Sequence, residues 1–406
     1  ANGKAAFLCV LVAICLNPVF FIHLYSGLET PLFIFLVIES FGLLADGRAR
    51  KREKYFYILL LLLPLTRPEG AVFAAAALGL HLWHARGRIG SLWLLGGLAA
   101  LGLAYFVWRY HYFGQLLPNS FYVKSLHAFT PGRFARNVFE AVPFLLMTAF
   151  VLLLCPNNEV RVLALVSTAL FLCLYAPSRL AMNFAVRFPF QVFFPAIVLW
   201  AAFHRARVTP ILFTALLFFV VDITYEARID SIAGYYPRAV HSHVDLGRSL
   251  SRYRDAGYTL MTSDGGMIPY YSEWKCYDYV GLADAHIARR GNDKAYMTAI
   301  DPDVILVKSN PTDPADVVTS HHEDILMAHI RRSGSYAYVG AAQWRKHYYL
   351  LAFVKDTLPD FDAIAASLRA VATRSREQNR RVRFMDVLRL RYLFGNPPTT
   401  DAAQTM

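Results

Sequence analysis

Residues 55–84 read YFYILLLLLPLTRPEGAVFAAAALGLHLWH, two apolar runs that are interrupted by the sequence Thr66-Arg67-Pro68-Glu69-Gly70. If the whole stretch were one kinked helix in a membrane, Arg67 and Glu69 would lie near the bilayer centre. Each charge would then cost about 2.5–3.5 kcal/mol. Pro68 would also remove a backbone hydrogen-bond donor from the middle of that helix. We therefore predict a helical hairpin whose charged turn emerges into water.

The hairpin lies within a long apolar region. Hydrophobic residues make up 56% of the 406 residues, charged residues only 17%, and the mean hydropathy is +0.35. From Ala5 to Ala45 the only Asp, Glu, Lys or Arg residues are Glu29 and Glu39, whereas charges recur every few residues from Tyr225 onward. A spanning helix needs about 20 apolar residues, and fewer where helices line a cavity. Nine segments have this character: 5–22, 31–45, 55–66, 71–83, 91–108, 138–155, 162–177, 188–203 and 211–223.

These patterns predict an α-helical polytopic membrane domain over residues 1–223. A small soluble α/β domain follows at 224–396, with a loose polar tail at 397–406. In the soluble part, some stretches have the composition of strands and others the periodicity of helices. The predicted strands are Tyr258–Ser263, Tyr277–Val280, Val304–Val307, Tyr336–Val339 and His347–Val354, and the predicted helices are Ala283–Arg290 and Ala363–Arg374.

Charge and cysteine content argue against several other classes of protein. The net charge is +12, but most short basic runs flank apolar segments, as in membrane proteins, and no nucleic-acid-binding motif accompanies them. The five cysteines have no zinc-site spacing, and we predict no metal site. The chain starts at Ala1 and enters an apolar segment almost at once, so we interpret it as a fragment that lacks its N-terminus.

The hairpin also predicts an orientation. With its turn outside, the basic cluster at 48–54 lies in the cytoplasm and the soluble domain lies outside it. The Lys/Arg count does not decide between the two orientations, so this prediction rests on the cost of buried charge. The outward loops then carry cations that suit a lipid phosphate, although snorkelling membrane anchors are the alternative. The candidates are Arg67, Arg109, Lys124, Arg179 and Arg187.

Two acidic residues accompany these cations. Glu29 lies between two apolar segments, where a carboxylate is suited to bind a sugar hydroxyl or to orient a base. The alternative is that this stretch only starts a helix at Thr30. Glu69 is placed to hold Arg67, whose planar fork suits phosphate oxygens, or else the two form a structural ion pair. Aromatic and polar residues alternate over 108–124, which favours a membrane-interface belt and sugar stacking equally.

In the soluble part, a predicted strand ends in Ser263-Asp264-Gly265-Gly266, and Tyr271 and Asp278 follow. A turn of this kind is common at ligand sites of α/β domains, but a structural turn is equally consistent, since the GxGxxG spacing is absent. The histidine pairs have no metal-ligand spacing and are predicted to lie on the surface. They are His241, His243, His321 and His322.

Taken together, four of these pieces resemble the bacterial GT-C membrane glycosyltransferases, which use polyprenyl-phosphate sugars as donors. The nearest likeness is to the terminal β-(1→2)-arabinofuranosyltransferase group of the mycobacterial cell envelope. The resembling pieces occur in the expected order and run from residue 26 to residue 289. They are Ser26–Thr30, Thr66–Gly70, the run from Tyr112 to Lys124, and the stretch that contains Asp264, Asp278 and Arg289.

The resemblance implies inverting transfer of a sugar, arabinofuranose in the nearest group, to a cell-envelope glycan. It places the protein in the bacterial plasma membrane with its C-terminal domain outside. In that family a catalytic Asp follows the first span, upstream of the start of this chain, so we assign no catalytic residue. The cations, or a divalent metal ion, would steady the leaving phosphate, and Glu29 and Glu69 would position them or the sugar. Asp264, Tyr271 and Asp278 are candidates for binding the acceptor.

Two other classes stay open. A transporter or flippase-like protein for lipid-linked glycans would share the apolar segments, but it should show two repeat-related halves, and no internal repeat is visible. A non-catalytic scaffold whose soluble domain binds partners is the third interpretation.

Overall fold

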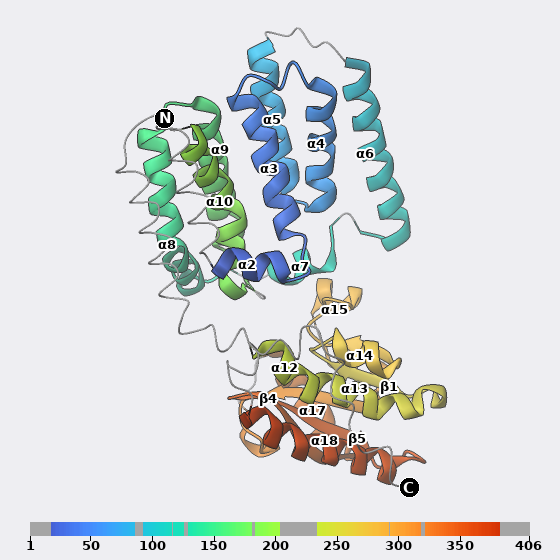
Figure 1. Cartoon of the computed structure of the whole chain (residues 1–406). Coiled ribbons are helices and arrows are strands. Elements are labelled where there is room, and N and C mark those ends of the chain that lie inside the picture. Colours follow the sequence, from blue (N-terminus) through green and yellow to red (C-terminus); the bar gives the residue numbers. More distant parts are fainter. Residues whose placement is uncertain are drawn as a thin grey trace, which may run out of the picture. The chain divides into compact units, whose positions relative to one another are not determined.

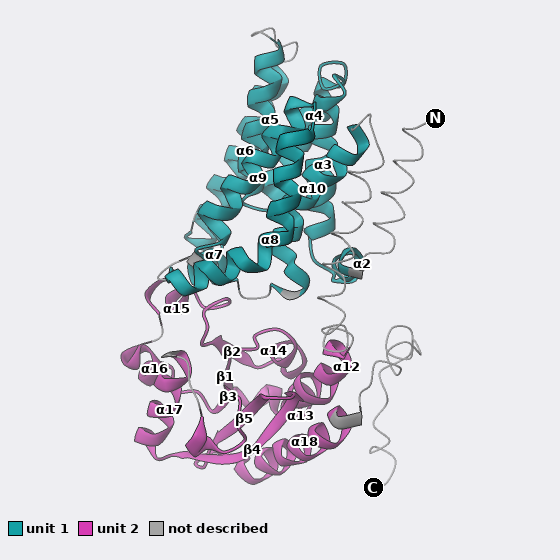
Figure 2. Cartoon of the chain, turned by 90° about the vertical axis from the view of Figure 1, so that its left-hand side faces the viewer, with its two compact units in different colours: residues 1–226 teal, residues 227–406 magenta. Residues whose placement is uncertain are grey.

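The computed structural model describes residues 18–85, 92–115, 117–125, 129–180, 183–203, 234–291, 293–317 and 321–381 (Figure 1). The chain divides into two compact units, residues 1–226 and 227–406 (Figure 2). The predicted segment 211–223, the tail 397–406 and most of the segment 5–22 lie outside the described residues.

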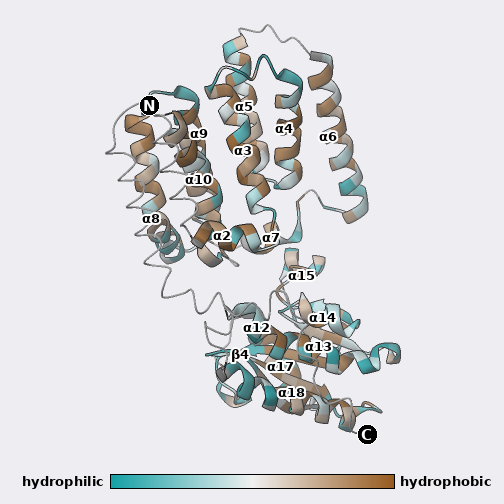
Figure 3. Cartoon of the chain, viewed as in Figure 1, coloured by the Kyte–Doolittle hydropathy of each residue, from teal (hydrophilic) through white to brown (hydrophobic). Residues whose placement is uncertain are grey.

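The first unit is built from helices. Figure 3 shows that hydrophobic residues dominate these helices. Helix α10 packs against α3, α8 and α9, and α4 packs against α3, α5 and α6. The α-helices are α2 (Pro18–Tyr25), α3 (Thr30–Ala45), α4 (Glu53–Thr66), α5 (Gly70–Ala85), α6 (Leu92–Phe113), α7 (Asn119–Ser125), α8 (Pro131–Leu154), α9 (Asn158–Leu170) and α10 (Arg187–Phe203). A π-helical turn, η1 (Phe171–Tyr175), extends α9, and a 3₁₀ turn, η2 (Phe184–Val186), precedes α10.

The predicted break between residues 66 and 70 is confirmed as a turn between two helices. The backbone of Arg67 is extended, and its N–H donates to the Leu63 carbonyl, 3.1 Å away, which ends α4. The Gly70 N–H then donates to the Arg67 carbonyl at 2.9 Å, and α5 begins there. Helices α4 and α5 pack against each other. The charged turn therefore lies at the end of both helices rather than in the middle of one.

Seven of the nine predicted apolar segments coincide with helices, but few of these are long enough for a full span. Within the described part of the chain, only Pro131–Leu154 and Asn158–Tyr175 combine the length and hydropathy that crossing a membrane requires. A third candidate is the pair Val19–Tyr25 and Thr30–Ala45, which is bent by 111°. The prediction of nine spans counted apolar segments, and helices of 14–17 residues such as α4 and α10 are about 21–26 Å long. That is shorter than the roughly 30 Å hydrocarbon core of a bilayer.

The second unit is an α/β domain with a five-stranded sheet in the order β2-β1-β3-β5-β4. Strand β1 pairs in parallel with β2 and β3, and β5 pairs antiparallel with β3 and β4. The strands are β1 (Thr259–Thr262), β2 (Lys275–Asp278), β3 (Val304–Ser309), β4 (Tyr336–Arg345) and β5 (Tyr348–Lys355). All five predicted strands are present, but β4 extends six residues beyond its predicted end at Val339.

Alternating side chains of the strands bury both faces of this sheet. Leu260, Val304 and Leu350 pack on one face in a cluster that also contains residues of α13 (Asp245–Leu250), α14 (Met267–Ser272) and α18 (Phe361–Arg381). Met261, Ile305 and Leu351 pack on the other face with residues of α16 and α17. The remaining elements are α12 (Tyr235–Ala239), η3 (Val240–Val244), η4 (Ser251–Ala256), α15 (Ala285–Arg290), α16 (Lys294–Ile300), η5 (Pro314–Asp316) and α17 (His321–Ser333).

Candidate functional site

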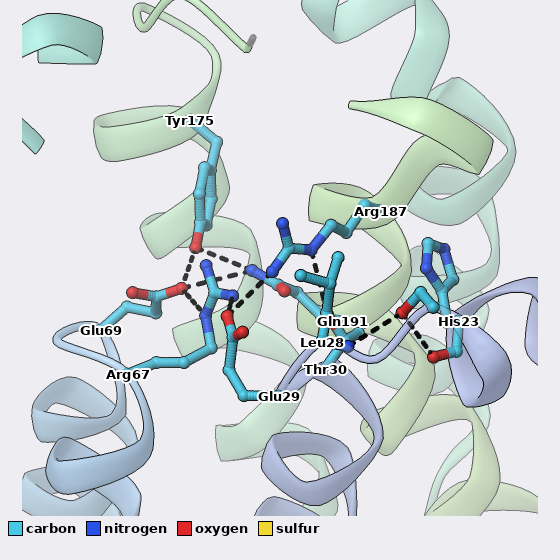
Figure 4. A network of polar contacts seen from close by, with 10 residues as sticks. His23, Leu28, Glu29, Thr30, Arg67, Glu69, Tyr175, Arg187 and Gln191 are labelled. Carbon is cyan, nitrogen blue, oxygen red and sulfur yellow. Dashed lines mark hydrogen bonds and ion pairs between the residues drawn. The ribbon is translucent and has the colours of Figure 1, made fainter. Parts of the chain in front are cut away.

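Three helices of the first unit begin at one place. Glu29 immediately precedes α3, Glu69 immediately precedes α5, and Arg187 is the first residue of α10. Their side chains point toward one another, together with those of Arg67 and Tyr175 (Figure 4). The N-terminus of a helix carries a partial positive charge of about half a unit, which favours anions. The turns that precede three apolar helices therefore form one polar centre.

Two arginines meet on the carboxylate of Glu29. Both bond the same oxygen, Oε1: Nη2 of Arg187 donates to it at 2.8 Å, and Nη1 of Arg67 also donates to it. Nε of Arg187 donates to the hydroxyl of Thr30, 3.0 Å away, which fixes the plane of the guanidinium group. The two cations are thus held side by side by a single carboxylate oxygen.

Glu69 is held more firmly than Glu29. Its Oε1 accepts hydrogen bonds from Nε of Arg67, from the hydroxyl of Tyr175, and from Nε2 of Gln191 at 3.2 Å. Nε2 of Gln191 also donates to the Tyr175 hydroxyl at 2.9 Å, which closes the network. Charge-assisted bonds of this kind are about twice as strong as neutral ones. Glu69 therefore serves as the fixed point on which Arg67 is oriented.

The exposure of the four charged side chains differs. Those of Arg67, Glu69 and Arg187 are only 7–11% exposed, whereas that of Glu29 is 38% exposed. The two arginines and two glutamates balance formally, but three helix N-termini add positive potential. The centre as a whole therefore favours negative charge, and Glu29 is its most accessible member.

A cleft of about 270 Å³ opens beside this centre. Arg67, Glu69 and Tyr175 contribute polar groups to its wall, and the rest of the lining is mostly apolar. The other lining residues are Pro68, Val72, Leu117, Pro118, Ser120, Phe121, Leu170, Leu174, Ser178, Leu180 and Phe188. An apolar cleft with charged groups at one wall suits a ligand that has an apolar chain and a polar head.

The structure brings together four of the seven residues that the sequence predicted for donor binding: Glu29, Arg67, Glu69 and Arg187. Arg109 lies on α6 and makes no hydrogen bond or ion pair with any described residue of the centre. Arg179 is exposed just after η1, and it makes no hydrogen bond or ion pair with any described residue of the centre. Lys124 belongs to α7, but its side chain is not among those that the structure describes.

Two members of the centre, Tyr175 and Gln191, were not predicted as site residues. Each lies in an apolar helical segment, and Gln191 is fully buried. A polar residue inside an apolar segment is unusual and often marks a functional site, and this signal could have identified both. Thr30 was predicted only as a helix start. It does begin α3, and its hydroxyl also accepts a hydrogen bond from Arg187.

In the second unit, Asp264 is the centre of a smaller polar cluster. It follows β1, at the carboxyl end of the parallel strands, and accepts hydrogen bonds from Nε2 of His243 and from the hydroxyl of Tyr348, each at 3.0 Å. The prediction that His241 and His243 lie on the surface is wrong, because both are buried in η3, and the His243 ring packs on Trp344 of β4. Asp264 remains partly exposed and able to accept further hydrogen bonds.

The other two acceptor candidates have local structural contacts. Asp278 ends β2 and accepts hydrogen bonds from the backbone N–H groups of Val280 and Ala283, at 2.9 and 3.0 Å. Burial raises the pKa of its carboxyl group, although these donors act in the opposite direction. Tyr271 lies in α14, where its ring is 5.4 Å from the guanidinium carbon of Arg248.

Replacing Asp278 with alanine should therefore loosen the loop that follows β2. Two partly buried hydrogen bonds from backbone N–H groups to this carboxylate would be lost, so we expect the unfolding free energy of this unit to fall by about 1–3 kcal/mol. Hydrogen exchange at the amides of Val280 and Ala283, followed by mass spectrometry, should become faster. Asp255→Ala, at a side chain that is 97% exposed, is the matched control and should change neither quantity. Unchanged exchange in Asp278→Ala would refute this structural role.

The described residues include no group of three or more His, Cys, Asp or Glu side chains that is arranged to hold a metal ion. Comparison with known proteins gives one match. Residues 231–377 match a family model described as a domain of unknown function (DUF8728), which covers much of the second unit. No curated protein and no solved structure matches the chain.

Proposed function

We propose that this chain is a membrane glycosyltransferase of the GT-C type. It would move a sugar, arabinofuranose in the nearest resembling group, from a polyprenyl-phosphate donor to a cell-envelope glycan. The observation that carries the proposal is the pair of guanidinium groups, Arg67 and Arg187, held together on Glu29 beside a mostly apolar cleft. We also propose a polytopic arrangement in the bacterial plasma membrane, with the second unit outside the cytoplasm.

The donor has two chemically different parts, and the cleft offers a surface for each. Leu117, Phe121 and Leu174 are apolar lining residues that suit an isoprenoid chain. Arg67 lines the cleft, and Arg187 is held beside it on the same Glu29 oxygen; both present forked donors that suit phosphate oxygens. Because the donor phosphate gains negative charge as it leaves, these cations would stabilise the transition state more than the ground state.

Transfer would proceed by attack of an acceptor hydroxyl on the anomeric carbon, from the face opposite the phosphate. The new bond joins the acceptor oxygen to the anomeric carbon, and the bond from that carbon to the phosphate oxygen breaks. The electron pair leaves with the polyprenyl phosphate, and a general base takes the hydroxyl proton. We assign no described residue to that base. Of the two carboxylate candidates for acceptor binding in the second unit, Asp264 is partly exposed whereas Asp278 is buried, so Asp264 is the one that can accept hydrogen bonds from a glycan.

The decisive experiment is to incubate the full-length protein in detergent with a radiolabelled polyprenyl-phosphate sugar and an oligosaccharide acceptor. A transferase releases one equivalent of free polyprenyl phosphate for each labelled sugar that joins the acceptor. Translocation without release of lipid phosphate, measured in proteoliposomes, would identify a transporter or flippase instead. If neither release nor translocation is detected, the binding scaffold remains as the interpretation. Translocation without release, or the absence of both activities, would overturn the proposal.

A further inference from the structure

We propose that the carboxylate of Glu29 occupies the place of the ligand phosphate, and that the phosphate group of a lipid phosphate displaces it. This inference rests on the proposed function, since it assigns a state to the same site. It differs from a permanent ion pair, in which Glu29 would stay bound to the two arginines when the ligand is present.

The geometry distinguishes the two glutamates of the centre. Glu69 accepts hydrogen bonds from three side chains and is 7% exposed, so leaving would expose several buried donors. Among the described residues, the Glu29 carboxylate accepts hydrogen bonds from Arg67 and Arg187 alone, both at Oε1, and its side chain is 38% exposed. Rotation about its side-chain bonds would bring its carboxylate into water. Of the two, Glu29 is the one that can leave.

The cations that Glu29 would leave behind are well suited to a phosphate. Arg187 remains oriented by Thr30, and Arg67 remains oriented by Glu69, so neither side chain would need to reorganise. Both guanidinium groups are largely buried, and an uncompensated buried charge is costly. A site that must remain open to a ligand therefore needs a temporary anion, and a carboxylate on a flexible side chain provides one.

The positive ends of three helices strengthen this preference. Helices α3, α5 and α10 all begin at the centre, and removal of one carboxylate would leave two arginines and three helix N-termini against Glu69 alone. Polyprenyl phosphate, the lipid product of the proposed transfer, is a phosphate monoester with up to two negative charges, so it compensates this potential better than one carboxylate does. The sugar-linked donor is a phosphodiester and carries one negative charge. The exchange of Glu29 for phosphate is therefore electrostatically favourable.

If Glu29 is displaced by phosphate, one substitution at the site should strengthen phosphate binding rather than weaken it. Because Glu29 competes with the ligand, Glu29→Gln should bind phosphate more tightly than the unmodified protein, by about tenfold, which corresponds to 1.4 kcal/mol. A residue that only helps to build the site would give weaker binding when it is changed. Arg187→Gln should weaken binding by at least about tenfold for the same reason of charge. Glu39→Gln, on the same helix but outside the centre, should bind as the unmodified protein does.

The experiment uses the full-length protein in detergent, with farnesyl phosphate, farnesol and inorganic phosphate as separate probes in calorimetric titrations. Tighter binding of both phosphates in Glu29→Gln, with farnesol unchanged, would support displacement and show that the phosphate group is what is recognised. Tighter binding of farnesyl phosphate alone would support displacement and identify the lipid as the source of the phosphate. Equal or weaker binding of farnesyl phosphate in Glu29→Gln would overturn the inference.

A second measurement uses the unmodified protein, so it does not depend on whether a variant folds. Carbodiimide labels accessible carboxylates, and mass spectrometry locates the label. Farnesyl phosphate should increase labelling of Glu29 and leave Glu69 unlabelled; a decrease or no change at Glu29 would overturn displacement. Both measurements record binding and do not depend on transfer. If Glu29 is displaced but the transfer assay shows no release of lipid phosphate, the transferase proposal is refuted and this inference stands.

Discussion

Replacing Arg187 with glutamine should reduce the rate of sugar transfer by about 100-fold or more, which is the usual effect of removing one charged donor from a developing anion. Glutamine retains an N–H donor but loses the positive charge and the fork. Arg67→Gln should have an effect of similar size, because Arg67 donates to the same Glu29 oxygen as Arg187 does. The transfer rate of Arg187→Lys should lie between those of the unmodified protein and Arg187→Gln, since lysine retains the charge but not the planar geometry.

A loss of transfer activity in these variants must be distinguished from a loss of folding. Arg136→Gln removes the same charge from an exposed position on α8 and should keep full activity. Each variant should be purified in detergent, and its unfolding temperature measured beside its transfer rate. If Arg187→Gln and Arg67→Gln fold normally and transfer sugar as fast as Arg136→Gln, the arginine pair does not stabilise the leaving phosphate, and the proposed mechanism is wrong.

The helical hairpin could be predicted because its signal is local. Pro68 and two adjacent charges interrupt an apolar run, and each of these features disfavours a continuous helix by itself. The strands of the second unit could be located for a similar reason, since β-branched and aromatic residues cluster in them. The end of β4 could not be located, because Gly340, Ala341 and Ala342 have poor strand propensity. Pairing with β5 extends the strand through them.

The contacts of the polar centre depend on distances along the chain that no local pattern records. Glu29 meets Arg67 across 38 residues and Arg187 across 158 residues. The sequence indicated that each was unusual, because each is a charge at the edge of an apolar segment, but not that they share one carboxylate oxygen. His243 shows the opposite error. It was predicted to lie on the surface because it has no metal-ligand spacing, but the fold buries it beside Asp264 and Trp344.

Gly70 allows the start of α5 to lie close to the backbone of α4 because it has no side chain. A Cβ atom built on Gly70 would lie 2.1 Å from the Leu63 carbonyl oxygen and 2.4 Å from its carbon, which are backbone atoms that cannot move aside. The turn at 67–69 brings α5 onto the end of α4 at this distance, and Arg67 and Glu69 lie in that turn. A larger residue at this position must therefore separate the two helices and move both charged side chains.

We expect Gly70→Ala to destabilise the protein by at least about 1–3 kcal/mol, the usual cost of overpacking, and to reduce transfer because Arg67 and Glu69 would shift. Gly79→Ala provides a matched control in the same helix, where nothing lies within 4 Å of the added Cβ atom. Alanine favours helix over glycine by about 0.8–1.0 kcal/mol, so Gly79→Ala should be neutral or stabilising. Thermal unfolding and transfer rates of the two variants in detergent give the comparison. Equal unfolding temperatures would mean that α4 and α5 do not pack as closely at residue 70 as the geometry requires.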